Sequence, residues 1–187
     1  MRKKQKGFIL GFGFVGVICF TYYYFFSSTA ILNHVIQYKG YDVQIVQENY
    51  PVAFFIEPTW FSLEKEQTQK VNKVVYEKNH TKIILRNVIL REDQLIFDFT
   101  TDYDLPYVKG DFLYNVIFNS NRTHTTISFI DEFELTNSMH QPIELGQRGR
   151  GPNSDFGFNI EKEQWPLIEQ GFTVRYLGMY LYEYEKE

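Results

Sequence analysis

A long stretch without acidic or basic residues constrains the fold of this chain more than any other feature. Four of the first six residues are Lys or Arg, and no Asp, Glu, Lys or Arg then follows until Lys39. Residues 8–26 include eleven Phe, Ile, Leu or Val, and as a helix this stretch would be about 28 Å long. A bilayer core is roughly 30 Å thick. We therefore expect residues 7–26 to form one transmembrane helix.

The basic residues at the N-terminus also predict an orientation, because Lys and Arg accumulate on the cytoplasmic side of membrane spans. Residues 1–6 would form a cytoplasmic tail and residues 27–41 a juxtamembrane linker. Residues 42–187 would form a domain outside the cell membrane. The alternative is secretion after cleavage near Ala30, because Ser28, Thr29 and Ala30 are small. The apolar core of a signal peptide is only about 7–15 residues long, so an uncleaved anchor is favoured.

The segment Gly11–Gly16, GFGFVG, matches the G-x-G-x-x-G fingerprint of dinucleotide-binding folds. That fingerprint needs a strand before it, a helix after it and an acidic residue about 20 positions later. Only ten residues precede Gly11, and Ile36, Gln37 and Tyr38 occupy the later positions. We therefore expect no cofactor.

The external part is acidic and has no cysteine, because Cys19 is the only one in the chain. Beyond the N-terminal tail, 15 Lys and Arg stand against 23 Asp and Glu, a net charge of −8. Nucleic acid is therefore excluded as an expected partner. A disulfide-free external domain on a single anchor is typical of a bacterial envelope protein.

The sequence after Lys39 alternates between apolar and polar residues, as strands do. The segments VNKVVYE, TKIILRNVIL and DQLIFDFTTDY predict an antiparallel meander, with turns at 78–80 and 91–93. Further strands are expected at 42–48, 52–57, 112–119, 125–135, 156–160 and 172–184. Short helices are expected at 61–72 and 161–169, the second cut short by Pro166. The expected fold class is all-β, an immunoglobulin-like antiparallel β-sandwich after one N-terminal transmembrane helix.

Three segments carry a resemblance to a known group of domains. They are NKVVYEKNHTKIILRNVILREDQLIFDFTT, SFIDEFELTNSMHQPIEL and GFTVRYLGMYLYEYEK, within residues 70–187. Their order of strand, polar turn and aromatic strand resembles the immunoglobulin-like external domains of Gram-positive membrane-anchored proteins, including those attached to anti-sigma factors. The resemblance implies a fold and a location, and no catalytic residues. Because only six residues precede the expected span, a sigma-regulatory role is not expected.

Two serines could in principle be nucleophiles. Ser62 and Lys65 match the S-x-x-K spacing, in which Lys takes the proton of Ser, but no S-D-N or K-T-G follows. Ser138 precedes Met139 as in membrane-anchored signal peptidases, but it lies far from the anchor, so we interpret it as part of a turn. We expect no enzyme activity.

Metal-ligand spacing is also missing. The loop TTDYDLPYVKGD offers Asp102, Asp104 and Asp111, but Tyr107 stands where an EF-hand needs glycine. The four histidines, at positions 34, 80, 124 and 140, show no zinc spacing. A solvated acidic loop is favoured over a calcium site.

The loop 146–159, GQRGRGPNSDFGFN, combines pliable glycines with Arg148 and Arg150 on an acidic domain. These two side chains are candidate partner-binding residues, because paired guanidinium groups bind anions and carboxylates. The alternative is an inter-strand loop with solvated charges.

The last predicted strand carries an aromatic face, with Tyr176, Tyr180, Tyr182 and Tyr184 as further candidate binding residues. If this face points outward, it could bind a glycan ring, a peptide or another subunit. If it points inward, it is core, which is the favoured alternative because large aromatic residues are usually buried.

Together these features predict a membrane-anchored binding or scaffolding protein of the bacterial cell envelope, with a protein or glycan partner. The alternatives are a sensory or regulatory accessory subunit of a membrane complex and, less favoured, an envelope serine hydrolase or peptidase.

Overall fold

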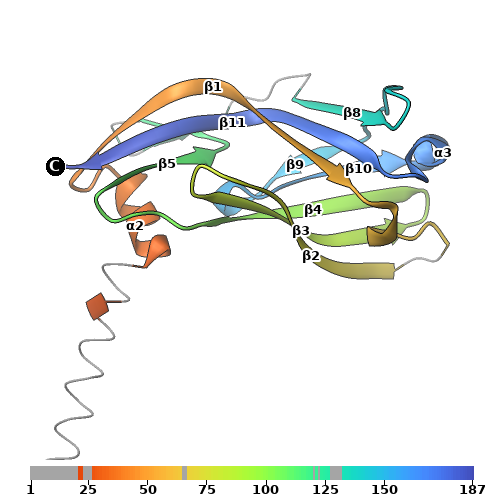
Figure 1. Cartoon of the computed structure of the whole chain (residues 1–187), viewed down its shortest axis with the longest axis horizontal. Coiled ribbons are helices and arrows are strands. Elements are labelled where there is room, and N and C mark those ends of the chain that lie inside the picture. The colour runs from red at the N-terminus through yellow and green to blue at the C-terminus, as the bar shows by residue number, and fades with distance from the viewer. Residues whose placement is uncertain (1–20, 23–26, 65–66, 120, 122, 127–131) are drawn as a thin grey trace, which may run out of the picture.

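The computed structural model describes residues 21–22, 27–64, 67–119, 121, 123–126 and 132–187 (Figure 1). The strands are β1 (Tyr41–Ile56), β2 (Gln67–Lys78), β3 (Thr81–Arg91), β4 (Gln94–Tyr103), β5 (Lys109–Tyr114), β6 (Ile117–Phe118), β7 (His124–Thr125), β8 (Phe133–Asn137), β9 (Arg148–Arg150), β10 (Phe156–Glu161) and β11 (Phe172–Lys186). The helices are α2 (Ser28–Val35) and α3 (Trp165–Ile168), with 3₁₀ turns η1 (Pro58–Trp60), η2 (Pro152–Ser154) and η3 (Lys162–Gln164).

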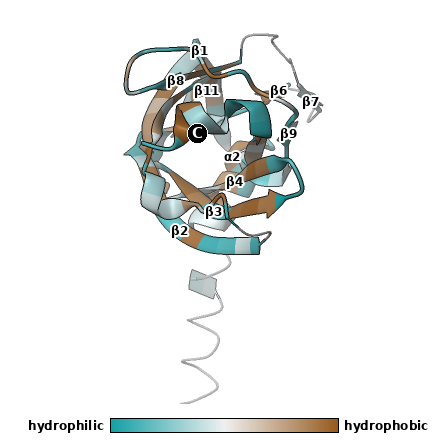
Figure 2. Ribbon diagram, turned by 90° about the vertical axis from the view of Figure 1, so that its right-hand side faces the viewer, coloured by the Kyte–Doolittle hydropathy of each residue, from teal (hydrophilic) through white to brown (hydrophobic). Residues whose placement is uncertain are grey.

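Nine of the described strands form two antiparallel sheets, here called sheet A and sheet B, and β6 and β7 pair only with each other. In sheet A the long strand β11 pairs with β1 on one side. On its other side β11 pairs with β8 through its first half and with β5 through its second half. Sheet B has the order β2-β3-β4-β10-β9. Figure 2 shows β1, β8 and β11 above and β2, β3 and β4 below, so the two sheets form a sandwich.

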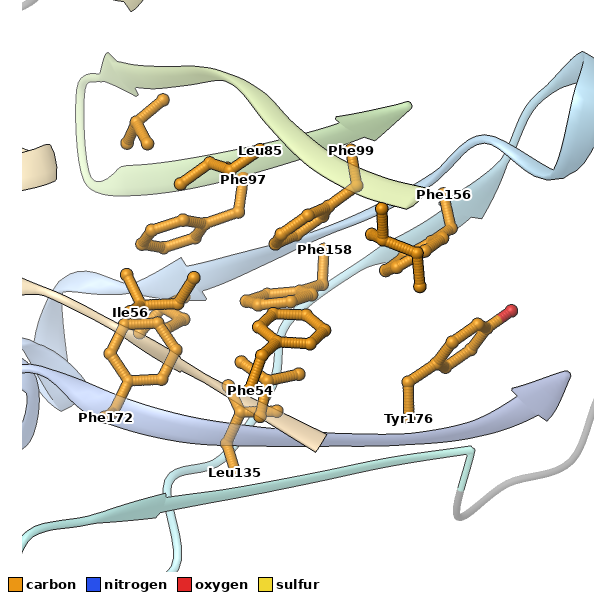
Figure 3. Packing of buried hydrophobic residues seen from close by; sticks show 14 of the residues in the cluster. Phe54, Ile56, Leu85, Phe97, Phe99, Leu135, Phe156, Phe158, Phe172 and Tyr176 are labelled. Carbon is orange, nitrogen blue, oxygen red and sulfur yellow. The ribbon is translucent and has the colours of Figure 1, made fainter. Parts of the chain in front are cut away.

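Aromatic residues from both sheets fill the space between them. Phe97 and Phe99 of β4 and Phe158 of β10 point inward from sheet B, and each is at most 2% exposed. Phe54 of β1 and Phe172 of β11 face them from sheet A (Figure 3). The ring centres of Phe54 and Phe99 lie 5.4 Å apart, and those of Phe97 and Phe172 lie 5.3 Å apart. In β3 and β4 the period-two pattern of the sequence thus becomes one buried and one outer face.

The predicted meander is confirmed as β2, β3 and β4. Its first turn consists of Asn79 and His80, whose φ angles of 53° and 48° fit the two-residue turn that matches the twist of a hairpin. The two strands expected at 42–48 and 52–57 are one strand, β1, with register shifts in its middle. Asn49 has a φ of 50° there, and Pro51 lies two residues later, so the strand bends without ending.

The helix expected at 61–72 is wrong, because β2 starts at Gln67 and pairs with β3 up to Lys78. Pairing with a strongly apolar neighbour overrides the helical propensity of this polar segment. The helix expected at 161–169 is confirmed as η3 and α3. Pro166 does not cut it short, since it lies in the first turn of α3, where a missing N–H costs nothing.

Helix α2 lies in the segment that the sequence predicts as a juxtamembrane linker, and it is part of the folded domain. Ile31, Leu32 and Val35 are at most 6% exposed. They belong to a second apolar core with Tyr41 and the second halves of β5 and β11, including Tyr182. The Ser27 hydroxyl accepts a hydrogen bond from the Ala30 amide at 3.3 Å and caps the helix. The helix therefore packs against the strands that follow it in the chain.

Within the part of the chain that the structure describes, no helix is long and apolar enough to span a membrane. The span predicted at residues 7–26 lies outside the described residues, except for Thr21 and Tyr22.

Candidate functional site

A groove of about 480 Å³ crosses the outer face of sheet B, over β3, β4, β10 and β9. Small-molecule sites in proteins have volumes of roughly 300–1,000 Å³. The groove is therefore large enough to hold a ligand. Its floor and walls follow from the register of four neighbouring strands.

Two glycines leave the floor of the groove without side chains. The pairing of the strands places Asp98, Gly157 and Gly149 in one row across β4, β10 and β9. A Cβ atom at Gly157 would lie 2.8 Å from the carbonyl oxygen of Phe97, so only glycine fits there. A Cβ atom at Gly149 would meet no atom within 4 Å. The space above these residues is open because both lack side chains.

An apolar row lies beside the glycines. Ile89 of β3 pairs with Ile96 of β4, and both line the groove from the outer face of the sheet. Each is only partly exposed. These two side chains give the groove a small hydrophobic surface next to its polar walls.

One wall is an ion pair with a fixed geometry. The guanidinium group of Arg86 lies 2.8 Å from Oδ2 of Asp98, and its Nε donates to the same oxygen at 2.9 Å. The side-chain amide of Asn87 also donates to Oδ2, at 3.0 Å. All three bonds end on Oδ2, so the other carboxylate oxygen of Asp98, Oδ1, can accept a hydrogen bond from a ligand.

The opposite wall consists of side-chain amides. Gln94 and Asn159 donate to one carboxylate oxygen of Glu161, at 3.3 and 3.1 Å. The side-chain oxygen of Asn159 accepts the backbone N–H of Gln147. The side chain of Gln147 is exposed at the edge of the groove. This wall offers the amide groups of Gln94 and Gln147 to a ligand.

The two predicted arginines lie on β9, in what the sequence suggests is a loop. Arg148 and Arg150 pair with Phe158 and Phe156 of β10 and line the edge of the groove. Arg150 forms an ion pair with Glu132, whose side chain is 4% exposed, and donates to the backbone oxygen of Asn115 at 2.8 Å. Its guanidinium group thus binds a carboxylate of the chain itself. No local sequence signal marks Glu132 as this partner.

A buried polar cluster continues from this ion pair. The hydroxyl of Ser154 accepts the Asn115 amide at 2.8 Å and donates to the Asn115 side chain at 3.1 Å. Asp155 accepts the Thr100 hydroxyl at 2.9 Å and the Thr101 amide at 3.1 Å. These bonds join β4 of sheet B to the chain after β5 of sheet A, along the edge of the sandwich that β9 covers.

The aromatic face of β11 points inward. Tyr176, Tyr180, Tyr182 and Tyr184 are at most 3% exposed, so the alternative of an external binding strip is wrong and the core alternative is confirmed. The hydroxyls of Tyr182 and Tyr184 donate to the backbone oxygens of Val116 and Pro106, at 2.9 and 2.6 Å. Burial, and next the carboxylate of Glu132, raise the pKa of Tyr176.

The other predicted residues do not come together in the groove. Ser62 accepts the nearby Glu64 amide at 3.4 Å, and Lys65 lies outside the described residues. Ser138 is exposed in the turn after β8. Neither serine lines this groove or a second groove, which lies on sheet A. Among the described residues, no group of three or more His, Cys, Asp or Glu is arranged to hold a metal ion.

The acidic residues of the predicted calcium loop have other roles. Asp102 accepts the Tyr103 amide at 2.9 Å, and the carboxylate of Asp111 is hydrogen-bonded to Nδ1 of His80 at 2.8 Å. Asp111 also lines a second groove, on the outer face of sheet A, with a volume of about 480 Å³. That groove brings together four carboxylates, from Asp42, Asp111, Glu183 and Glu185, and one Lys. Without a counterion, its charge disfavours acidic ligands.

No family model, curated protein or solved structure matches this chain.

Proposed function

We propose that this chain is a membrane-anchored, extracytoplasmic binding protein of the bacterial cell envelope, and that it binds its partner in the groove on sheet B. The observation that carries this proposal is the groove itself. Two glycines leave its floor bare, an apolar row lies beside them, and polar groups with unused bonding capacity form its walls. Concave sites with an apolar surface and a few placed polar groups are typical of ligand binding.

The position of α2 supports an uncleaved anchor. Cleavage after Ala30 would remove Ser27, which caps the helix, and the first turn that follows it. The new terminus would be Ile31, which is 2% exposed and packs in the second core. A domain whose core includes this segment favours a chain that keeps residues 1–30, with the span 7–26 as its anchor.

The sandwich supports the proposal that the domain is immunoglobulin-like, because domains of that class consist of two antiparallel sheets packed around one core. In this proposal the acidic domain stands outside the membrane, and its outer sheet B face meets envelope components.

A photo-cross-linking experiment in living cells tests this function. A benzophenone amino acid replaces Gly149, where a side chain meets no atom within 4 Å. Illumination should produce a covalent adduct with an envelope component. The control places the same amino acid at Met139, which is 70% exposed in the turn after β8 and does not line the groove. No adduct at 149, or the same adduct at both positions, would contradict binding in the groove.

A further inference from the structure

We propose that the ligand of this groove is a neutral sugar ring of a glycan. The inference rests on the proposed function and identifies the chemical class that the groove recognises. Three observations support it. The charged groups of the groove already form contacts within the protein, and the backbone of its floor is already hydrogen-bonded. A few polar and apolar side-chain groups remain for a ligand.

The charged groups of the groove are already engaged within the protein. Arg86 binds Asp98, and Arg150 binds Glu132. Asp155 accepts two bonds from β4, and Arg148 interacts with other groups of the chain as well. A charged ligand would have to compete with these contacts. A neutral ligand does not, so the groove is electrostatically matched to an uncharged molecule.

The backbone below the groove is engaged too. Along the floor β4 is paired with β3 and β10, and β10 is paired with β4 and β9, so the N–H and C=O groups of these two strands are used in the ladders. An extended peptide recognises a protein by adding its own backbone to a free strand edge. The face of a paired sheet cannot offer that contact, which disfavours a peptide in this groove.

The remaining groups suit hydroxyl groups. Each hydroxyl of a sugar both donates and accepts a hydrogen bond. Oδ1 of Asp98 can accept, and the exposed amide of Gln147 can both donate and accept. The row of Ile89 and Ile96 offers an apolar contact to the C–H face of a ring. A carboxylate oxygen, an amide and a small apolar surface therefore lie within one groove of about 480 Å³.

The test measures binding of neutral tetrasaccharides to the full chain in a zwitterionic detergent without a sugar headgroup. The panel contains glucose-based and N-acetylglucosamine-based oligosaccharides, measured by saturation-transfer NMR and calorimetry. Oligogalacturonate serves as the anionic comparison. At least one neutral oligosaccharide should bind, and the anionic one should bind more weakly.

Two variants test whether the oligosaccharide binds in the groove. Gly149→Trp fills the open space and should weaken binding by at least about tenfold, a loss of about 1.4 kcal/mol. Gln147→Ala removes an exposed amide without disturbing the fold and should weaken it by a smaller factor. Met139→Trp, which adds the same bulk to an exposed turn, should bind as the unmodified chain does. Thermal unfolding of each variant shows that it is folded.

The outcomes separate this inference from the proposed function. Absence of binding by every neutral oligosaccharide, or equal binding by Gly149→Trp, overturns the sugar assignment. If the photo-cross-link at position 149 nevertheless yields an adduct with a protein or an anionic polymer, the groove remains a binding site for another class of ligand. If position 149 yields no adduct, the proposed function itself fails.

Discussion

The carboxylate of Glu132 and the guanidinium of Arg150 form an ion pair that joins the two sheets at one edge of the sandwich. Glu132 directly precedes β8 of sheet A, and its backbone oxygen also accepts the Leu177 amide of β11 at 2.8 Å. Arg150 belongs to β9, the last strand of sheet B. The short strand β9 is therefore held from both sides, by β10 and by this ion pair, which keeps the edge of the ligand groove in place.

Removing one partner of this buried ion pair should destabilise the domain strongly. Glu132→Gln or Arg150→Met would leave an uncompensated buried charge, so the free energy of unfolding should fall by about 3–5 kcal/mol. The double variant should lose less than the sum of the two single losses, because it leaves neither charge unpaired. Denaturant unfolding of the full chain in detergent measures all three.

The pair Arg175 and Glu134 is a matched control for that experiment. It joins the neighbouring strands β11 and β8, but both side chains are nearly half exposed. Solvent-exposed ion pairs contribute about 0–1 kcal/mol, so Arg175→Met and Glu134→Gln should change stability by no more than this. Equal losses at the buried and the exposed pair would contradict the role of Glu132.

Two glycines should respond oppositely to alanine. A Cβ atom at Gly178 would meet the Glu132 carboxylate and the Tyr176 hydroxyl, so Gly178→Ala should lower the free energy of unfolding by about 1–3 kcal/mol. Gly149→Ala meets nothing and should leave it unchanged or raise it by about 0.4–1 kcal/mol, because the unfolded chain loses freedom. Thermal unfolding compares them. A stable Gly178→Ala variant would show that this part of the core adapts.

The buried tyrosines predict a loss of stability at alkaline pH. Burial raises the pKa of Tyr176, Tyr180, Tyr182 and Tyr184 above the ordinary value near 10. Above pH 10 the unfolded chain loses these protons while the folded domain retains them, so the unfolded state gains stability. The stabilisation is complete below pH 10 and decreases as the pH rises further. Urea unfolding from pH 8 to pH 11.5 should show this decrease.

Tyr180→Phe isolates one of these groups. The hydroxyl of Tyr180 is buried and has no hydrogen-bond partner among the described residues, so its removal should cost little at neutral pH. Above pH 10 the variant should lose stability less steeply, by up to about 1.4 kcal/mol per pH unit for one group. An unchanged alkaline slope would mean that Tyr180 ionises as easily in the folded domain as in the unfolded chain.

Helix α2 should contribute to the stability of the domain. Leu32 is 6% exposed in the second core, so Leu32→Ala should lower the free energy of unfolding by about 2–5 kcal/mol. Asn33→Ala changes the exposed neighbour in the same helix and should have little effect. If both variants unfolded like the unmodified chain, α2 would be a linker after all.

The meander and the two-sheet architecture could be predicted because their signals are local. The strands β2, β3 and β4 alternate in sequence and end at turn residues such as Asn79. Strand β9 could not be predicted, because its three residues, Arg148 to Arg150, contain no apolar side chain. It is a strand only because β10 pairs with it, and that pairing is tertiary.

The candidate site could be predicted only in part. The glycine-rich segment and Arg150 stood out, but the partner of Arg150 did not, since Glu134 near Glu132 is equally acidic in sequence. The groove depends on the register that places Asp98 beside Gly157, and no local pattern determines this register. The inward direction of the tyrosines on β11 depends on which face meets sheet B, so the sequence left two alternatives.

Thiol labelling of intact cells shows whether the groove faces the outside of the cell. Gly149→Cys, in a chain whose only native cysteine is removed by Cys19→Ala, places one thiol in open space. A membrane-impermeant maleimide added to intact cells should label this thiol as fully as it does after permeabilisation. Labelling that appears only after permeabilisation would put sheet B on the cytoplasmic side and contradict an extracytoplasmic binding domain.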